Sequence, residues 1–581
     1  MHYFSLLGCV FFFSVSIFSQ TPFEIEKRDY IWLFGYGDSS YEGFGGSLLD
    51  FNYSPVDIFF EDREVDLNVT NASICDKEGN LLFFTNGIIA ANALGDTLLN
   101  GYGLNPGEFA NDFSDGYVLN QGALILPVSK SDSLFYIFHG IREYSTQELG
   151  GHVSSLNYSI IENFGSQERV SEKNIVIIED TLALGEITAV RHANGRDWWI
   201  LVPEFNSNKY YNCLFTPNGI EAVDTQIIGD TVQSGLAQAV FSSNGEWYAR
   251  INLINGVFAE DRIDLYSFDR CNGELSNQIS LIYHDTASAA GIAFSSNSEY
   301  LYVSSSNYVY QYDLNAGDIE SSRVTIAEYD GFQSPFATRF FLAQLAPDDQ
   351  IYINSSNSVN TLHVIREPNR LGIRANVDQH ALQLPTLNRA TLANNPYYGL
   401  GPLDGSYCDT LGLDNHPIAY FRHTESGLEA TFTDYSKLAP TDWFWKFGDG
   451  QTSEEINPIH QYEEPGMYNV CLTVSNENNS HEFCDSVQII LTTTNEPLSP
   501  IDISIYPNPS RDYFFVSSED RFPNQSQIIV YNLLGQEQIK KAVDPTQTRQ
   551  LIDVSYLPKG VYVIQIVVDG KVIGSEKVLK Q

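Results

Sequence analysis

AVFSSNGEWYARI (239–251) and AFSSNSEYLYVSS (293–305) are two copies of one sequence unit, in which an apolar strand, a short polar turn and an aromatic-rich strand follow one another. The unit recurs through the first 370 residues or so, and its turn positions are spaced by 53, 63, 50, 53 and 51 residues. So regular a spacing indicates a repeat architecture. The other copies are SICDKEGNLLFFT (73–85), ILPVSKSDSLFYIF (125–138), AVRHANGRDWWIL (189–201) and AQLAPDDQIYINS (343–355).

Each copy predicts a β-hairpin, because Asn-Gly at 194–195 and 244–245 supplies the positive φ angles that tight turns require. Further strands follow each hairpin, so a unit holds about four strands. Four antiparallel strands per roughly 40–55 residues are typical of a propeller blade, whose radial repetition protects the sheet edges. A solenoid is the alternative, but no sustained 3.6-residue period is present. The further strands are SLNYSII (155–161), KYYNCLF (209–215), RIDLYSF (262–268), YVYQYDL (308–314) and TLHVIRE (361–367).

The number of blades depends on the ends of the repeat region. The six hairpins indicate six blades, but IWLFG (31–35) and SLLDFNY (47–53) could join ALQLPTL (381–387) to close a seventh. We favour seven blades, with six as the alternative. The phrases WLFG, ITAVRHANGRDWW, GIAFSSNSEYLYVSS, VYQYDL and LAPDDQIYI, in this order, resemble exported bacterial propellers of the WD-like type. The resemblance spans most of residues 25–400 and implies the fold, whereas that group has no settled activity to carry over.

Residues 420–491 read as short alternating strands of a size suited to one β-sandwich. Trp445-Lys446-Phe447-Gly448-Asp449-Gly450, then Asn457-Pro458, His460-Gln461-Tyr462 and Gly466, resemble the pattern of a polycystic-kidney-disease-type (PKD) domain. The resemblance implies an immunoglobulin-like spacer or weak binding module. A disulfide between Cys471 and Cys484 is also expected, because their midpoint falls in the polar turn SNENNS and both have the parity opposite to the core positions.

The chain ends in a third module, separated from the sandwich by the Thr- and Pro-rich stretch LTTTNEPLSP (491–500). ISIYPNPSRDYFFV (503–516), IIVYNLLGQEQIKKA (528–542) and LPKGVYVIQIVVDGKVIGSEKVLKQ (557–581) resemble the three blocks of a type IX secretion system type A sorting domain. The resemblance implies a small β-sandwich sorting domain recognised by that machinery at the outer membrane of Gram-negative bacteria. Its motif residues are Pro507, Asn508, Pro509, Gly535 and Gly560.

Residues 4–18 form an apolar run that predicts a secretory signal peptide, removed after residue 19. No other apolar run of about 18 residues follows, so no transmembrane segment is expected in the mature chain. Six cysteines then remain, an even number that permits disulfides, and none has zinc spacing. The predicted organisation is an all-β protein with a signal peptide (1–19), a propeller (20–414), a PKD-type domain (415–493), a linker (494–500) and a sorting domain (501–581).

The formal net charge is −41, and so acidic a surface would repel nucleic acid and anionic lipid. Residues 498–581 are net neutral, whereas residues 415–493 carry −9 and most of the remaining charge precedes them. The acidity therefore belongs to the displayed part of the chain. Calcium could be suggested through Asp449, but one carboxylate falls well short of the 6–8 oxygens that the ion takes. The metal is left open, and no other cofactor is expected.

Arg191-His192 and Asp197-Trp198-Trp199 form the densest unusual cluster. Arg191, His192, Trp198 and Trp199 could line a sugar or peptide pocket, because aromatic faces accept apolar sugar faces and Arg adds directional donors. The alternative is packing between sheets. No catalytic residue is assigned, since GxSxG, HExxH, a phosphate-binding loop, an EF-hand and sialidase Asp boxes are all absent and sequence cannot select a carboxylate pair.

We therefore expect a secreted or cell-surface, non-catalytic binding protein that presents a propeller face to an extracellular protein or glycan. One alternative is a secreted hydrolase or lyase acting on polysaccharide, and another is a structural envelope component. A ring of acidic or His residues at one mouth of the central channel would favour the enzyme. Aromatic and amide side chains there would favour binding.

Overall fold

The computed structural model describes residues 21–37, 39–128, 132–144, 151–163, 168–231, 236–253, 261–285 and 290–490, and in the C-terminal region 503–506, 508, 510–511, 513–518, 522, 526–532, 536–543, 549–568 and 571–580. The protein is all-β, as predicted. The short helix α1 (Glu108–Asp112) and the turns η1 (Glu320–Ser322) and η2 (Gly372–Ala375) are the helical elements of this described part. The predicted signal peptide and the linker 494–500 lie outside it. The chain divides into two compact units, the first with most residues up to Ile489 and the second with the C-terminal region from Ile490.

The repeat region is a series of antiparallel sheets, each built from strands that follow one another in the chain. The first sheet has three strands. The second and third have four strands each and join through β8 and β12 into one eight-stranded sheet, and four-stranded sheets follow. The strands are β2 (Ile31–Gly35), β3 (Gly46–Asp50), β4 (Asp57–Glu61); β5 (Ala72–Cys75), β6 (Leu81–Thr85), β7 (Ile89–Asn92), β8 (Thr97–Tyr102); β9 (Ala123–Pro127), β10 (Leu134–Glu143), β11 (His152–Asn163), β12 (Glu168–Leu182); β13 (Thr188–Arg191), β14 (Trp198–Pro203), β15 (Lys209–Thr216), β16 (Gly219–Ile227); β17 (Leu236–Phe241), β18 (Trp247–Leu253), β19 (Asp261–Asp269), β20 (Glu274–Tyr283); β21 (Ala290–Phe294), β22 (Tyr300–Ser305), β23 (Tyr308–Asp313), β24 (Val324–Glu328); and β25 (Phe340–Leu345), β26 (Ile351–Ser355), β27 (Ser358–Ile365), β28 (Val377–Arg389).

The six predicted hairpins are all confirmed as antiparallel strand pairs. Five of the turn residues have the positive φ that tight turns require, for example 71° at Gly245 and 60° at Ser298, and the turn of the 125–138 hairpin includes residues outside the described part. The first strand of a sheet is buried on both faces, as in β13, whereas the last is partly exposed, as in β16. This gradient explains why the first strands read as continuous apolar runs, while the outer ones alternate.

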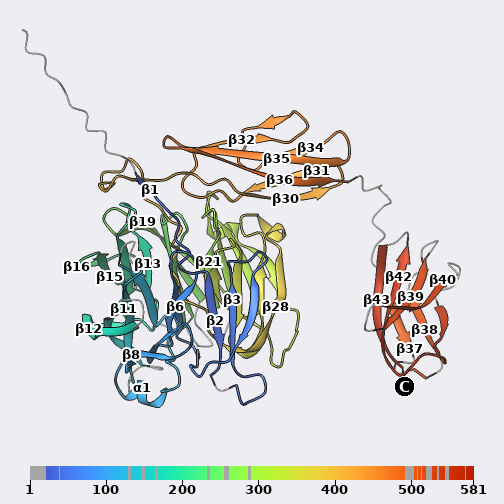
Figure 1. The fold of residues 1–581 in the computed structure, drawn as a ribbon, viewed down its shortest axis with the longest axis horizontal. Helices are drawn as coiled ribbons and strands as arrows, with labels where there is room; N and C mark the ends of the chain where they lie inside the picture. Colours follow the sequence, from blue (N-terminus) through green and yellow to red (C-terminus); the bar gives the residue numbers. More distant parts are fainter. Residues whose placement is uncertain are drawn as a thin grey trace, which may run out of the picture. The chain divides into compact units, whose positions relative to one another are not determined.

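The predicted pairing of residues 381–387 with the N-terminal strands is wrong. These residues lie in β28 and pair with β27, and β2, β3 and β4 form a sheet of their own. The two sheets pack against each other instead (Figure 1): the rings of Trp32 and Tyr352 lie 5.6 Å apart, and the hydroxyl oxygens of Ser47 and Thr386 lie 2.6 Å apart. An apolar alternation predicts a strand but does not identify its neighbour, so the sequence could not distinguish the two arrangements.

A buried segment after β28, the closing segment (residues 391–398), connects several sheets. The amide of Asn394 donates to the carbonyl oxygens of Ala123 and Ile187, both at 2.9 Å. The Tyr398 hydroxyl donates to the carbonyl of Ile125 at 2.9 Å. Beyond it, β1 (Thr21–Pro22) pairs in parallel with β29 (Leu413–Asp414), and a disulfide joins Cys271 to Cys408. The two ends of the repeat region are therefore held together.

Residues 421–489 form two sheets around an aromatic core that contains Trp445 and Phe432. Cys471 lies opposite Cys484, with Cα atoms 4.0 Å apart, and a disulfide joins them, which is the pair expected from the sequence. Their neighbours Val470 and Leu472 point into the core. The strands are β30 (Phe421–Ser426), β31 (Glu429–Asp434) and β34 (Ile459–Gln461) in one sheet, and β33 (Thr452–Ser453), β32 (Asp442–Lys446), β35 (Gly466–Ser475) and β36 (Ser480–Ile489) in the other.

The C-terminal unit also has two small sheets around one core. Of the predicted sorting motif, Asn508 fixes the last strand, because its amide donates to the carbonyl of Lys577 and its side-chain oxygen accepts from the N–H of Leu579. Gly560 begins β42. Pro507, Pro509 and Gly535 lie outside the described residues. The strands are β37 (Ile503–Tyr506), β38 (Tyr513–Ser518), β41 (Arg549–Asp553); and β40 (Glu537–Ala542), β39 (Gln527–Asn532), β42 (Gly560–Val568), β43 (Lys571–Lys580).

Candidate functional site

The four predicted ligand-binding residues do not form one exposed cluster. Arg191 ends β13 and Trp198 begins β14, and none of Arg191, His192, Trp198 and Trp199 is more than 9% exposed. Trp198 and Trp199 are adjacent in a strand, so their indoles point to opposite faces of the sheet and enter two different cores. The structure therefore separates the residues into two pairs.

His192 and Trp199 form the first pair and pack toward the loop that contains Cys271. The Trp199 indole N–H donates to the carbonyl of Arg270 at 2.9 Å, and a ring nitrogen of His192 lies 3.1 Å from the carbonyl oxygen of Cys271. Burial lowers the pKa of His192. Both side chains are buried and their polar atoms have hydrogen-bond partners, so they contribute to packing between neighbouring sheets.

Arg191 and Trp198 form the second pair. The guanidinium carbon of Arg191 lies 4.3 Å from the centre of the Trp198 ring and 5.3 Å from that of Phe23. Both residues line a cavity of about 270 Å³, whose walls also include Phe23, Leu411 and Leu413. This cavity is separate from the two hollows that follow.

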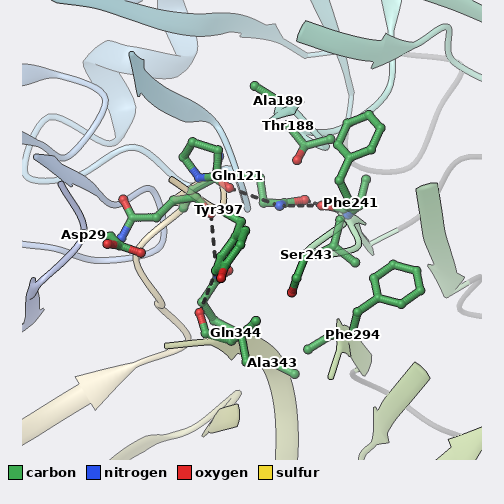
Figure 2. A pocket seen from close by; sticks show the side chains of 17 residues that line it. Asp29, Gln121, Thr188, Ala189, Phe241, Ser243, Phe294, Ala343, Gln344 and Tyr397 are labelled. Atoms are coloured by element: carbon green, nitrogen blue, oxygen red, sulfur yellow. Dashed lines mark hydrogen bonds between the residues drawn. The ribbon is translucent and has the colours of Figure 1, made fainter. Parts of the chain in front are cut away.

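A small cavity lies where the first strands of several sheets meet the closing segment (Figure 2). Gln121 donates to the carbonyl of Ala239 at 2.9 Å and to the side-chain oxygen of Asn394 at 3.1 Å, and Gln344 donates to the carbonyl of Asn395. The cavity measures about 40 Å³, which suits a few waters at about 10–15 Å³ each and is too small for a sugar. Four side-chain amides and three aromatic rings are among its 17 lining residues, but the cavity admits no ligand of useful size.

Asp29 is the one carboxylate that lines this cavity in the described part of the chain. Burial raises its pKa to about 7, and the charge of Asp349 adds to this, while Lys437 opposes it. The ring of acidic or His residues that would have favoured an enzyme is therefore not found among the described lining residues.

A third hollow is an open cleft of about 650 Å³, the tyrosine cleft, lined by loops of the first two sheets. Tyr41 and Tyr102 are 65% and 64% exposed. The ring centre of Phe44 lies 4.6 Å from that of Tyr36 and 5.9 Å from that of Tyr41. Exposed aromatic rings in a hollow offer flat apolar surfaces that a ligand can cover. The cleft is lined by Tyr36, Gly37, Tyr41, Phe44, Glu64, Val65, Asp66, Asn86, Ile89, Gly95, Asp96, Thr97, Tyr102, Ser114 and Asp115.

Carboxylates stand among these rings. Burial raises the pKa of Asp66 to about 6, the neighbouring charge of Asp115 adds to this, and Arg389 and Arg63 oppose it. The amide of Asn86 donates to the backbone carbonyls of both Asp66 and Asp115, at 3.0 and 3.1 Å, and so holds the two segments together. One oxygen of Asp66 has no hydrogen-bond partner among the described residues. The cleft thus places carboxylate residues next to aromatic faces.

The sequence does not reveal this cleft, because its residues come from five separate segments. A signal existed in GYGDSSYEGFGG (35–46), where Gly, Tyr, Phe and acidic residues alternate within one loop. Glycine-rich loops with aromatic residues favour exposed recognition surfaces over packing. The partners Asp66, Asp96 and Asp115 carry no such signal, because acidic residues are common throughout the chain.

Possible metal ligands are few in the described part of the chain. Asp404, Asp409 and Asp414 place carboxylate oxygens within 4.8 Å of one another, but three carboxylates fall short of a calcium shell. Asp449, considered from the sequence, accepts a hydrogen bond from the backbone N–H of Gln451 at 2.9 Å and lies 2.7 Å from a ring nitrogen of His460. Both carboxylate oxygens of Asp449 are therefore already engaged by other protein groups.

Two family models match the chain: the PKD domain over residues 418–491 and the secretion system C-terminal sorting domain over residues 504–581. Both modules belong to these families. The second implies an interaction with the type IX secretion machinery and marks a secreted or cell-surface protein. Among the described residues, no helix has both the length and the apolar character needed to cross a membrane.

Among proteins of known sequence, "Collagenase ColQ1" of Bacillus cereus (strain Q1) is 51% identical over 35 residues, which are 6% of this chain and 4% of the collagenase. Among solved structures, the PKD1 domain of the Vibrio cholerae metalloprotease PrtV is 29% identical, with 13% of this chain and 98% of that domain covered and a TM-score of 0.13. An exo-beta-1,3-galactanase from Phanerochaete chrysosporium is 8% identical, with 80% and 96% covered and a TM-score of 0.26. These similarities concern short segments or low scores and support no assignment of activity.

Proposed function

We propose that the protein is a non-catalytic binding protein, exported to the cell surface or beyond, whose repeat region is a seven-bladed β-propeller and whose tyrosine cleft binds a neutral glycan. The PKD domain spaces this region from the sorting domain, which directs export. The observation that carries the proposal is the combination of exposed Tyr41 and Tyr102 with carboxylates in one open cleft.

The propeller is supported by the succession of sheets and by their closure. The first strands of neighbouring sheets lie against one another, as β2 does against β5, β17 against β21 and β21 against β25. β28 lies against β2, β3 and β4, so the last sheet returns to the first. One apolar core contains Trp32 and Leu49 from the first sheet together with Tyr352 and Leu362 from the last. Radial closure of this kind leaves no long sheet edge exposed in an all-β chain.

A neutral glycan fits the chemistry of the cleft. Sugar rings present C–H faces that pack on tyrosine rings and hydroxyl groups that donate to carboxylates and amides. Among the described residues that line the cleft there is no Lys or Arg, while Glu64, Asp66, Asp96 and Asp115 are present. These charges disfavour an anionic glycan by like-charge repulsion.

The test is a glycan screen of the full mature chain, followed by titration of a neutral oligosaccharide that it retains. We expect Tyr41→Ala with Tyr102→Ala to weaken binding about ten- to thirty-fold, because truncation removes the central aromatic contacts. Tyr53→Ala is the matched control, since Tyr53 is 55% exposed and lies outside the cleft. An unchanged affinity in the double variant would contradict the proposed site.

A polysaccharide hydrolase or lyase is the second candidate, favoured by one observation. Burial and the neighbouring charge of Asp115 raise the pKa of Asp66 to about 6, and a carboxyl group with a raised pKa beside a second carboxylate is a pattern found in glycosidases. Incubation of a retained oligosaccharide with the wild type and with Asp66→Asn distinguishes the two. Release of new reducing ends by the wild type alone would favour the enzyme, and an intact oligosaccharide would favour binding.

A further inference from the structure

The cavity lined by Arg191 and Trp198, about 270 Å³ in volume, shares no lining residue with the tyrosine cleft. Its walls come from the segment after β1, from the end of β9, from the β13–β14 hairpin, and from Leu411 and the start of β29. They are largely apolar, with Phe23, Pro127, Trp198, Leu411 and Leu413. Such walls suit an apolar ligand body and offer little to a sugar hydroxyl.

Arg191 is the unusual member of this wall. It is 7% exposed and stacks between Trp198 and Phe23. Among the described residues, its one hydrogen bond is a long contact of 3.4 Å from Nη1 to the carbonyl of Gly195, and its Nε has no partner. A guanidinium normally offers five donors, so most of its hydrogen-bonding capacity is unused.

The nearby carboxylates are engaged by other cations. Glu26 accepts from Nε of Arg28 at 2.7 Å. Asp197 accepts from Arg196 at 2.7 Å and from the amide of Asn194 at 2.6 Å. No ion pair joins Arg191 to a carboxylate within the described part of the chain.

A second buried arginine provides the comparison. Arg250 is fully buried, and its guanidinium lies 2.9 Å from the carboxylate of Glu186, which is equally buried. That is the usual solution for a buried charge, because an unpaired one loses its hydration without compensation. Burial lowers the pKa of Arg191 to about 10, and the charge of Glu26 opposes this shift only in part.

We propose that the cavity binds a carboxylate with an apolar body, the carboxylate on the guanidinium of Arg191 and the body against Trp198, Leu411 and Leu413. The planar fork of arginine matches a carboxylate, and its stacking on Trp198 fixes its orientation. Glu24 and Glu26 also line the cavity. They disfavour multiply charged anions such as phosphates, so a single negative charge fits best. The ligand is either a small free acid or the C-terminal residue of a peptide.

The test is calorimetric titration of the full mature chain with four probes: benzoate, benzamide, N-acetyl-Ala-Ala-Phe as the free acid, and the same peptide as its C-terminal amide. We expect at least one acid to bind and its amide to bind ten- to a hundred-fold more weakly. A neutral amide cannot accept the two charge-assisted hydrogen bonds that a guanidinium donates to a carboxylate. Binding of benzoate alone identifies a small acid, and binding of the peptide acid identifies a chain terminus.

Arg191→Met should abolish this preference for the acid, whereas Arg169→Gln, at an exposed arginine that does not line the cavity, should leave it unchanged. The melting temperature without ligand should be unchanged or higher in Arg191→Met but clearly lower in Arg250→Met, because only Arg250 has a buried partner to lose. Leu411→Trp, which fills the cavity without touching the charge, serves if Arg191→Met fails to fold and should also prevent binding. Equal binding of acid and amide, no binding of either acid at millimolar concentration, or an unchanged preference in these variants would overturn the proposal.

Discussion

At the residue scale, side-chain amides hold the centre of the repeat region together. The Gln238 side chain accepts from the backbone N–H of Ile292 at 3.0 Å and donates to the carbonyl of Ala343 at 2.6 Å, so one residue connects β17, β21 and β25. Asn394 does the same for two other sheets. Amides suit this role because each carries both donors and acceptors and has no charge to desolvate.

Asp29 is the exception among these central polar groups, and it predicts a dependence of stability on pH. Burial raises its pKa to about 7 from an ordinary 3.8, so the folded chain keeps its proton at pH values where the unfolded chain has lost it. Stability therefore falls as pH rises from about 4 to 7. Asp29→Asn removes the penalty, and we expect it to be more stable than the wild type at pH 8 by about 1–3 kcal/mol. Thermal unfolding at pH 8 and pH 5 measures this, and an equal difference at both pH values would contradict it.

At the element scale, the disulfide between β35 and β36 should stabilise the PKD domain. It closes a short loop, with a sequence separation of 13. Replacing both Cys471 and Cys484 by Ser should lower the stability of this domain by about 2–3 kcal/mol on the chain-entropy model. The same change at Cys271 and Cys408, whose separation is 137, should cost more. Denaturant unfolding of the oxidised variants tests both, and equal stability of wild type and the first variant would refute the estimate.

The two disulfides also mark what could be predicted from the sequence. Cys471 and Cys484 lie on either side of one turn, so parity along two strands identified the pair. Cys271 and Cys408 are 137 residues apart and come together only through long-range packing, which no local pattern records. For the same reason the hairpins were predictable from turn chemistry, while the neighbour of β28 was not.

The candidate site follows the same rule. Arg191 and Trp198 lie in one hairpin, so composition alone drew attention to them, but their burial depends on Phe23 and Leu413 from the two ends of the region. The tyrosine cleft depends on loops of two sheets that the sequence does not bring together. Long-range assembly decides both, and a single sequence carries little information about it.

At the scale of the whole molecule, export should be accompanied by processing at both ends. We expect the secreted or surface form to lack residues 1–19 and about 80 C-terminal residues, the latter either removed or exchanged for an anchor. The expectation rests on the apolar N-terminal run and on the sorting domain. Intact-mass measurement of the exported protein decides it. Val578–Gln581 still attached to most of the mature protein would count against it.

The distribution of charge along the chain agrees with the separation of a displayed part from a sorting domain. The net charge of −41 belongs almost entirely to residues before the sorting domain, which is neutral. An acidic exterior keeps an exported protein dispersed, and it directs recognition toward ligands that are not anionic. The carboxylate-rich tyrosine cleft follows this rule, whereas the Arg191 cavity is a local exception enclosed in apolar walls.

Recognition of a neutral glycan by the tyrosine cleft is tested by comparing the Kd of one retained oligosaccharide for the wild type, the Tyr41→Ala/Tyr102→Ala variant and Tyr53→Ala. We expect a Kd about ten- to thirty-fold higher for the double variant alone, with melting temperatures within about two degrees of the wild type, since all three side chains are exposed. Equal Kd values for all three proteins would contradict it.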